Sequence, residues 1–197
     1  MKNLLLLLVL SSSLTVSRAQ VKYGGKIGLN LSDFTGDEAD EAKSKVGFNF
    51  GGFAEIPVAD AFAVKPELVF SKQGAKTEIT SVDSKFKLSY INIPVLVKYN
   101  TSSGFFVETG PQVGFLVSAK VKADNVLVDV KDQFKTTDFS WAFGLGYDII
   151  EYDFGVNLRY NLGLVNIADG GNSDLKNSVF QLGVYKTFGT PGAANPK

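Results

Sequence analysis

The clearest pattern in the chain is a strict alternation of bulky apolar residues with small or polar ones between Asp138 and Leu164. The apolar set is Phe139, Trp141, Phe143, Leu145, Tyr147 and Ile149, followed by Phe154, Val156, Leu158, Tyr160, Leu162 and Leu164. The positions between them carry Gly, Ala, Ser, Asn and Asp, together with Arg159. Because side chains alternate across a strand, the pattern predicts two strands joined by a tight turn, each with one apolar face and one small or polar face.

The composition of the small or polar face indicates on which side of the barrel wall it lies. A face built mainly from Gly, Ala and Asn suits a crowded polar interior better than open water. We therefore predict that the apolar faces contact lipid and the small faces line the lumen of a transmembrane barrel. A soluble, lipocalin-like barrel that binds a small apolar ligand would have the opposite orientation. It would leave these glycines outside, where they give a sheet no benefit: Gly24, Gly28, Gly47, Gly51, Gly144, Gly146, Gly155 and Gly163.

The same alternation predicts six further strands along the chain. Their ranges are 22–31, 46–56, 62–71, 86–99, 105–117 and 179–188. The connections alternate between long and short, as in bacterial outer-membrane barrels with short periplasmic turns and long external loops. The longest connection, 118–137, has its own alternation and a turn signal at Ala123-Asp124-Asn125, which predict a protruding hairpin. The predicted fold is all-β, an eight-stranded antiparallel up-and-down transmembrane β-barrel with a filled lumen.

Two sets of residues refine this prediction. Aromatic residues lie at the strand ends nearest the short turns and predict an inner aromatic girdle. They are Tyr23, Phe62, Tyr99, Phe105, Tyr152, Phe154 and Phe188. Pro66, Pro94 and Pro111 fall inside three strands, and proline removes a hydrogen bond from the ladder. We expect bulges or local breaks there, so the strand limits near these prolines are the least defined.

The two ends of the chain lie outside the predicted barrel. Residues 1–19 combine a basic start, the apolar run Leu4 to Leu10 and a small-x-small site at Ser17-Arg18-Ala19, which indicate a secretory signal peptide. The run is too short to span a bilayer as a helix. We assign 20–189 to the barrel domain and 190–197, with its two prolines Pro191 and Pro196, to a disordered tail.

Composition narrows the possible functions. The chain has 20 basic and 20 acidic residues, so its charge gives no reason to expect nucleic acid as a partner. It has no cysteine and no histidine, which removes thiolate chemistry and the usual general base. The acidic loop from Asp33 to Lys45 could bind calcium or magnesium, and the loop from Asp169 to Asp174 invites the same calcium hypothesis. Solvated charge and turn chemistry explain them better, so we predict no metal, no cofactor and no catalysis.

The lumen face carries five charged residues well within the predicted strands. They are Lys26, Lys65, Glu67, Glu108 and Arg159. Eight strands enclose a space that side chains can fill, and isolated charges there are costly, so these residues must pair. We predict a lumen ionic network that plugs the barrel. A gated narrow ion path is the functional alternative.

Three segments resemble a known family. They are Ser89 to Tyr99, Gly110-Pro111-Gln112-Val113-Gly114 and Arg159 to Leu164. Together they resemble the outer-membrane β-barrel family of Bacteroidetes-type bacteria often labelled PorT-like, within the wider class of small OmpA- and OmpX-like barrels. The resemblance implies the fold and location in the outer membrane of a Gram-negative bacterium. Some relatives are linked to protein secretion, and no catalytic motif accompanies the resemblance.

These observations predict an outer-membrane anchor or interaction protein. The barrel would be monomeric and surrounded by outer-membrane lipid, and its external loops, above all 118–137, would contact a protein partner. An accessory role in a protein-secretion apparatus and a narrow pore are the alternatives that keep the same orientation in the membrane.

Overall fold

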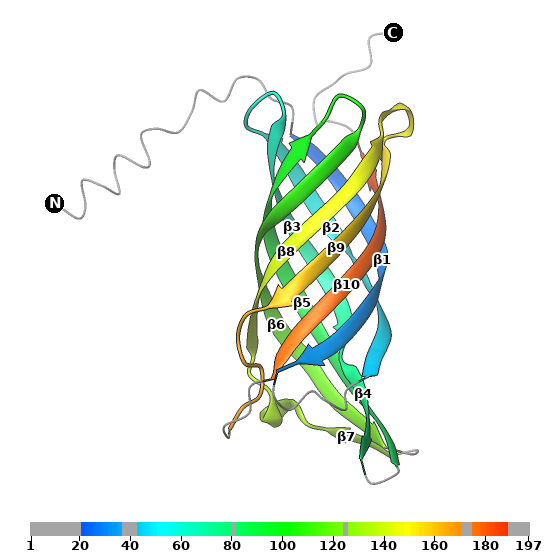
Figure 1. Cartoon of the computed structure of the whole chain (residues 1–197), viewed down its shortest axis with the longest axis vertical. Helices are drawn as coiled ribbons and strands as arrows, with labels where there is room; N and C mark the ends of the chain where they lie inside the picture. Colours follow the sequence, from blue (N-terminus) through cyan, green and yellow to red (C-terminus); the bar gives the residue numbers. More distant parts are fainter. Residues whose placement is uncertain (1–20, 37–42, 80–81, 124–125, 171–174, 189–197) are drawn as a thin grey trace, which may run out of the picture.

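The structure is a computed structural model that describes residues 21–36, 43–79, 82–123, 126–170 and 175–188 of the chain. Eight long strands form the wall of a closed, tilted barrel (Figure 1). They are β1 (Lys22–Thr35), β2 (Lys43–Pro57), β3 (Phe62–Gln73), β5 (Val82–Asn100), β6 (Phe105–Ala123), β8 (Thr137–Ile149), β9 (Phe154–Gly163) and β10 (Lys176–Thr187). Each strand pairs antiparallel with its neighbours, and β10 pairs with β1 to close the sheet. The predicted eight-stranded antiparallel barrel is confirmed.

The faces of the strands have the predicted orientation. Trp141 and Phe143 point outward with 38% and 51% of their surface exposed, whereas Arg159 points into the lumen with 1% exposed. The lipocalin-like alternative requires the reverse arrangement and is wrong. The exposed band of large apolar side chains continues around the barrel, as expected for a surface that contacts acyl chains.

Two short strands add to the eight of the wall. β4 (Ala75–Ile79) pairs with β5 and, for two residues, with β2; β7 (Val126–Asp129) pairs with the end of β6. The pairing of β6 with β7 confirms the hairpin predicted within 118–137. The alternation predicts no strand between 71 and 86, yet this segment holds β4 and the start of β5. Lysines occupy outward positions there, so the segment lacks the apolar face that marks a membrane strand.

The three prolines lie at gaps in the ladders. Pairing of β2 with β3 is interrupted between Phe53↔Glu67 and Ile56↔Val64. Pairing of β3 with β5 is interrupted between Pro66↔Val95 and Val69↔Asn92. Pairing of β5 with β6 is interrupted between Pro94↔Gln112 and Val97↔Thr109. The expected local breaks are therefore present, and the register is the same on both sides of each gap. The register shift in these ladders lies elsewhere, between Ser89 and Tyr90.

The barrel has two distinct ends. The inner end carries the short turns, including the 3-10 turn η2 (Ile150–Tyr152), and β1 begins and β10 ends there (Figure 1). The outer end carries the long connections with β4, β7 and the 3-10 turn η1 (Lys131–Gln133). The seven aromatic residues of the predicted inner girdle are all exposed. Among the described residues, no helix is long and apolar enough to cross a membrane.

The predicted signal peptide (1–19) and the predicted tail (190–197) lie outside the described residues. The domain limits assigned from the sequence therefore remain predictions.

Candidate functional site

The centre of the lumen holds a layer of five charged side chains, which we call the central ionic layer: Lys26, Lys65, Glu67, Glu108 and Arg159. These are the five residues that the sequence placed on the lumen face, and the structure brings all of them together. The Arg159 guanidinium donates to both carboxylate oxygens of Glu67, each at 2.8 Å, and its Nε donates to Glu108 Oε1 at 3.0 Å.

The two lysines complete the layer. Lys26 Nζ lies 3.0 Å from Glu67 Oε2, and Lys65 Nζ lies 3.3 Å from Glu108 Oε2 and 3.5 Å from Glu67 Oε1. All five residues are buried. Charge removed from water is stable only when it is paired and hydrogen-bonded, and here each carboxylate meets at least two cations. The arrangement fills the lumen at this level.

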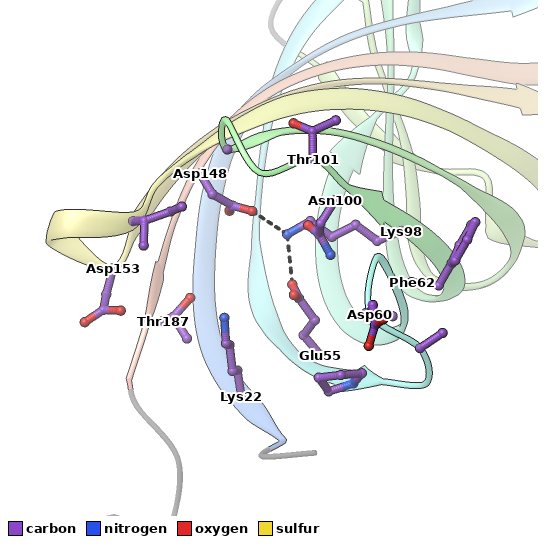
Figure 2. A pocket seen from close by; sticks show the side chains of 15 residues that line it. Lys22, Glu55, Asp60, Phe62, Lys98, Asn100, Thr101, Asp148, Asp153 and Thr187 are labelled. Atoms are coloured by element: carbon purple, nitrogen blue, oxygen red, sulfur yellow. Dashed lines mark hydrogen bonds and ion pairs between the residues drawn. The ribbon is translucent and has the colours of Figure 1, made fainter. Parts of the chain in front are cut away.

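A second ionic group, the inner trio, lies toward the inner end. Lys98 Nζ is 3.0 Å from Glu55 Oε2 and 2.8 Å from Asp148 Oδ2, and it lies between these two carboxylates in Figure 2. The trio borders a cavity of about 290 Å³ that is also lined by Lys22, Asp60 and residues of the short turns. The predicted ionic network omits the trio, although the alternation places all three residues on inward faces. They lie near the strand ends, whereas the predicted network contains only charges well within the strands.

Aromatic rings separate the inner trio from the central ionic layer. Phe53 and Phe106 both pack edge-on against Tyr185, with ring centroids 5.6 and 6.3 Å apart. Lys65 Nζ lies 4.7 Å from the Phe53 ring centroid, and Lys98 Nζ lies 4.2 Å from that of Phe106. The ring faces therefore stabilise one ammonium group on each side. The Tyr185 hydroxyl also donates to Asp148, which links the rings to the inner trio.

Uncharged polar side chains occupy the lumen on the outer side of the central ionic layer. Asn30 lies at their centre: it donates to Ser71 Oγ at 2.9 Å and accepts hydrogen bonds from Asn49 at 2.6 Å and Gln181 at 3.1 Å. All four residues are buried. These bonds satisfy polar groups that would be costly to leave unpaired.

The outermost layer is apolar, and we call it the outer cap. It consists of Phe34, Ala75, Leu88, Tyr90, Leu116, Ala119, Phe134 and Ile167. Phe134 lies in the connection that leads from β7 to β8, and Ile167 lies in the connection from β9 to β10. These two connections are joined by hydrogen bonds: the Lys135 amide donates to the Ile167 carbonyl at 2.8 Å, and the Asp169 amide donates to the Gln133 carbonyl at 2.9 Å. The connections thus carry apolar side chains into the outer end of the lumen and close it.

The two acidic loops carry no metal-binding arrangement in the part of the chain that the structure describes, where no three acidic residues group to hold an ion. Asp33 is a described member of the first loop, and its carboxylate accepts bonds from the Phe34 amide and the Ser44 hydroxyl. Asp37, Glu38, Asp40, Glu41 and the segment 171–174 lie outside the described residues.

The fold and the layered lumen define a small outer-membrane β-barrel. A model of the family described as "Outer membrane protein beta-barrel domain" matches residues 12–169, so the chain belongs to this family. The protein is located in the outer membrane of a Gram-negative bacterium. Small barrels of this family are typically non-catalytic. Comparison with curated protein sequences finds no significant match.

Solved structures support the fold. Neisserial surface protein A (NspA) superimposes with a TM-score of 0.61 at 14% identity, covering 84% of this chain and 97% of that one. Ail of Yersinia pestis, in complex with the heparin analogue sucrose octasulfate, gives a TM-score of 0.52 at 17% identity, covering 86% of this chain and 99% of that one. At these identities the likeness establishes the architecture alone.

Proposed function

We propose that this barrel is a surface interaction protein, in which a filled barrel anchors the β6–β7 hairpin for contact with a protein partner. The proposal rests on one observation. β7 pairs through one edge with β6, and its other edge has no strand partner among the described residues. An edge strand can accept a strand from another chain, and proteins usually protect such edges with charge, proline or bulges.

The side chains of β7 strengthen this proposal. Val126, Leu127 and Val128 are 62%, 51% and 52% exposed, so both faces of the strand present apolar side chains to solvent. A projecting edge that is apolar and free of proline is a surface to which partners bind. The filled lumen supports an anchor more than a conduit, since the central ionic layer and the outer cap occupy it at two levels.

The structure of one relative supports a surface-binding role. Ail was solved with a heparin analogue bound, which is consistent with a surface-binding role for barrels of this shape. The narrower likeness to PorT-like barrels, and with it an accessory role in secretion, rests on the three sequence segments alone.

A pair of double variants tests the proposal. Leu127→Lys with Val128→Lys places charge on the edge strand, whereas Val58→Lys with Ile150→Lys makes the same change at inner turns, where these side chains are 61% and 70% exposed. The measurement is recovery of partner proteins, identified and quantified by mass spectrometry, from intact outer membranes with tagged protein. We expect the β7 variant to lose a specific partner about tenfold, or about 1.4 kcal/mol of binding free energy.

The inner-turn variant should recover that partner at the wild-type level. A partner set that is the same for wild type and both variants would contradict a role for β7. Deleting the whole of 118–137 would be a less specific test, because it also removes Ala119 and Phe134 from the outer cap.

A further inference from the structure

Lysines gather on one sector of the outer surface, just beyond the apolar band. The strand register places several of them opposite one another: Lys76↔Lys85, Lys85↔Lys122 and Lys87↔Lys120. We define the lysine patch as Lys45, Lys72, Lys76, Lys85, Lys87, Lys120 and Lys122. All seven are exposed or half-buried. Like charges directly opposite in a ladder destabilise a sheet, so this arrangement needs a reason.

The ammonium groups of the patch act on one another. Partial burial lowers the pKa of Lys45, and so do the neighbouring charges of Lys87, Lys72 and Lys76, in that order. Lys45 Nζ donates to the Gln73 carbonyl at 2.8 Å. None of the seven lysines forms an ion pair with another described side chain, and Asp129 lies opposite Lys120 in the β6–β7 ladder. The patch therefore carries positive charge that the described part of the protein does not neutralise.

An apolar depression of about 500 Å³ lies on the lipid-facing surface of β10, β1 and β2. Its lining includes Leu29, Phe48, Phe50 and Leu182, and its walls are almost entirely apolar. Leu29 is 59% exposed and Leu182 is 55% exposed, so the depression opens toward the membrane.

Phe48 joins the depression to the lysine patch. Its ring lines the depression, and Lys72 Nζ lies 5.1 Å from its centroid. A single ligand in contact with both would need an anionic group at the level of the lysines and an apolar chain extending from it toward the middle of the membrane. Long connections face the exterior in barrels of this kind, so that level corresponds to the headgroups of the outer leaflet.

We propose that this sector binds a phosphorylated lipid of the outer leaflet, with its phosphate on Lys72, Lys87 and Lys45 and an acyl chain in the depression. Lysine is a good point-charge partner for phosphate. The continuity between patch and depression favours a lipid over a soluble phosphate, which would use the lysines alone. The proposal is independent of the β7 edge, because neither the depression nor these three lysines lie on that strand.

The test uses purified full-length protein in detergent micelles, titrated with bisphosphorylated lipid A, and native mass spectrometry to count bound lipid. The patch variant is Lys72→Gln with Lys87→Gln. Its control is Lys131→Gln with Lys135→Gln, which removes two exposed lysines outside the patch at the same end. Each lysine near an anionic headgroup contributes about fivefold to affinity, so the patch variant should bind about 30-fold more weakly. The control should change less than about twofold.

A second pair of variants separates lipid from free phosphate. Leu29→Trp fills the depression, and Leu68→Trp makes the same change at an equally exposed site, 58% against 59%, that does not line it. Leu29→Trp should weaken lipid A binding but leave binding of inositol hexakisphosphate unchanged, and Leu68→Trp should alter neither. If the Lys72/Lys87 variant and the Lys131/Lys135 control weakened lipid A binding equally, the proposed phosphate site on the lysine patch would be overturned. If inositol hexakisphosphate bound as tightly as lipid A and Leu29→Trp had no effect, the proposal that the ligand is a lipid would be overturned.

Discussion

The two ends of the lumen are closed by different means. At the outer end, two long connections carry Phe134 and Ile167 into an apolar cap that is almost fully buried. At the inner end, short turns leave a cavity of about 290 Å³, and Asp148 of the inner trio keeps 28% of its side chain exposed. A long connection has enough chain to fold back into the lumen and exclude water, and a short turn does not. Buried apolar contacts should therefore dominate stability at the outer end, and screened ion pairs should matter little at the inner end.

The central ionic layer separates the two ends, and breaking it should have the largest effect. Glu67→Gln removes the carboxylate that faces Lys26, Lys65 and Arg159. The remaining buried cations lose a partner, so we expect the free energy of unfolding to fall by about 3–5 kcal/mol. Urea titration in lipid vesicles measures this. A loss below about 1 kcal/mol would mean that water reaches the layer and that the lumen is not filled there.

Opening the outer cap should have the next largest effect. Phe134→Ala removes a buried ring that is 7% exposed, and the cavity should cost about 3 kcal/mol of unfolding free energy. Tyr152→Ala is the matched control, because it removes an aromatic ring that is 66% exposed at the inner end. Urea titration of both variants in vesicles makes the comparison. Similar losses for the two would show that the cap is not the better packed end.

Neutralising one member of the inner trio should have the smallest effect. In Asp148→Asn, Lys98 keeps its ion pair with Glu55 at 3.0 Å. Because Asp148 is partly exposed to the inner cavity, we expect a loss of about 1 kcal/mol or less in the same titration. A loss as large as that of Glu67→Gln would show that the inner cavity excludes water and that the two ends do not differ in this way.

The sequence predicts the barrel wall well, because lipid outside and a narrow lumen inside impose the same alternation on every strand. It also predicts that Arg159 pairs with carboxylates of the lumen, since buried charges of opposite sign must meet. It fails beyond the membrane, where β5 and β6 run to 19 residues each. There the outward positions hold Lys85 and Lys87, and the alternation no longer has an apolar face.

The outer cap could not be predicted from local pattern. It joins Phe34, near the end of β1, to Phe134 and Ile167, which lie far from it in the sequence in connections without a regular period. Only the register of the whole barrel brings them together. The strand limits at the three prolines show the opposite case, because the missing N–H of proline is a local property that correctly indicates breaks in the ladders.

The pairing of β1 with β10 has a consequence for biogenesis. Twelve residue pairs, from Gly24↔Thr187 to Thr35↔Lys176, form the seam of the barrel. Its two halves are separated by nearly the whole polypeptide, so closure must wait for the last strand to be synthesised and delivered. Until then the first strand has an unpaired edge, which is prone to mispairing. In the cell, a factor that shields that edge until the seam can form would prevent such mispairing.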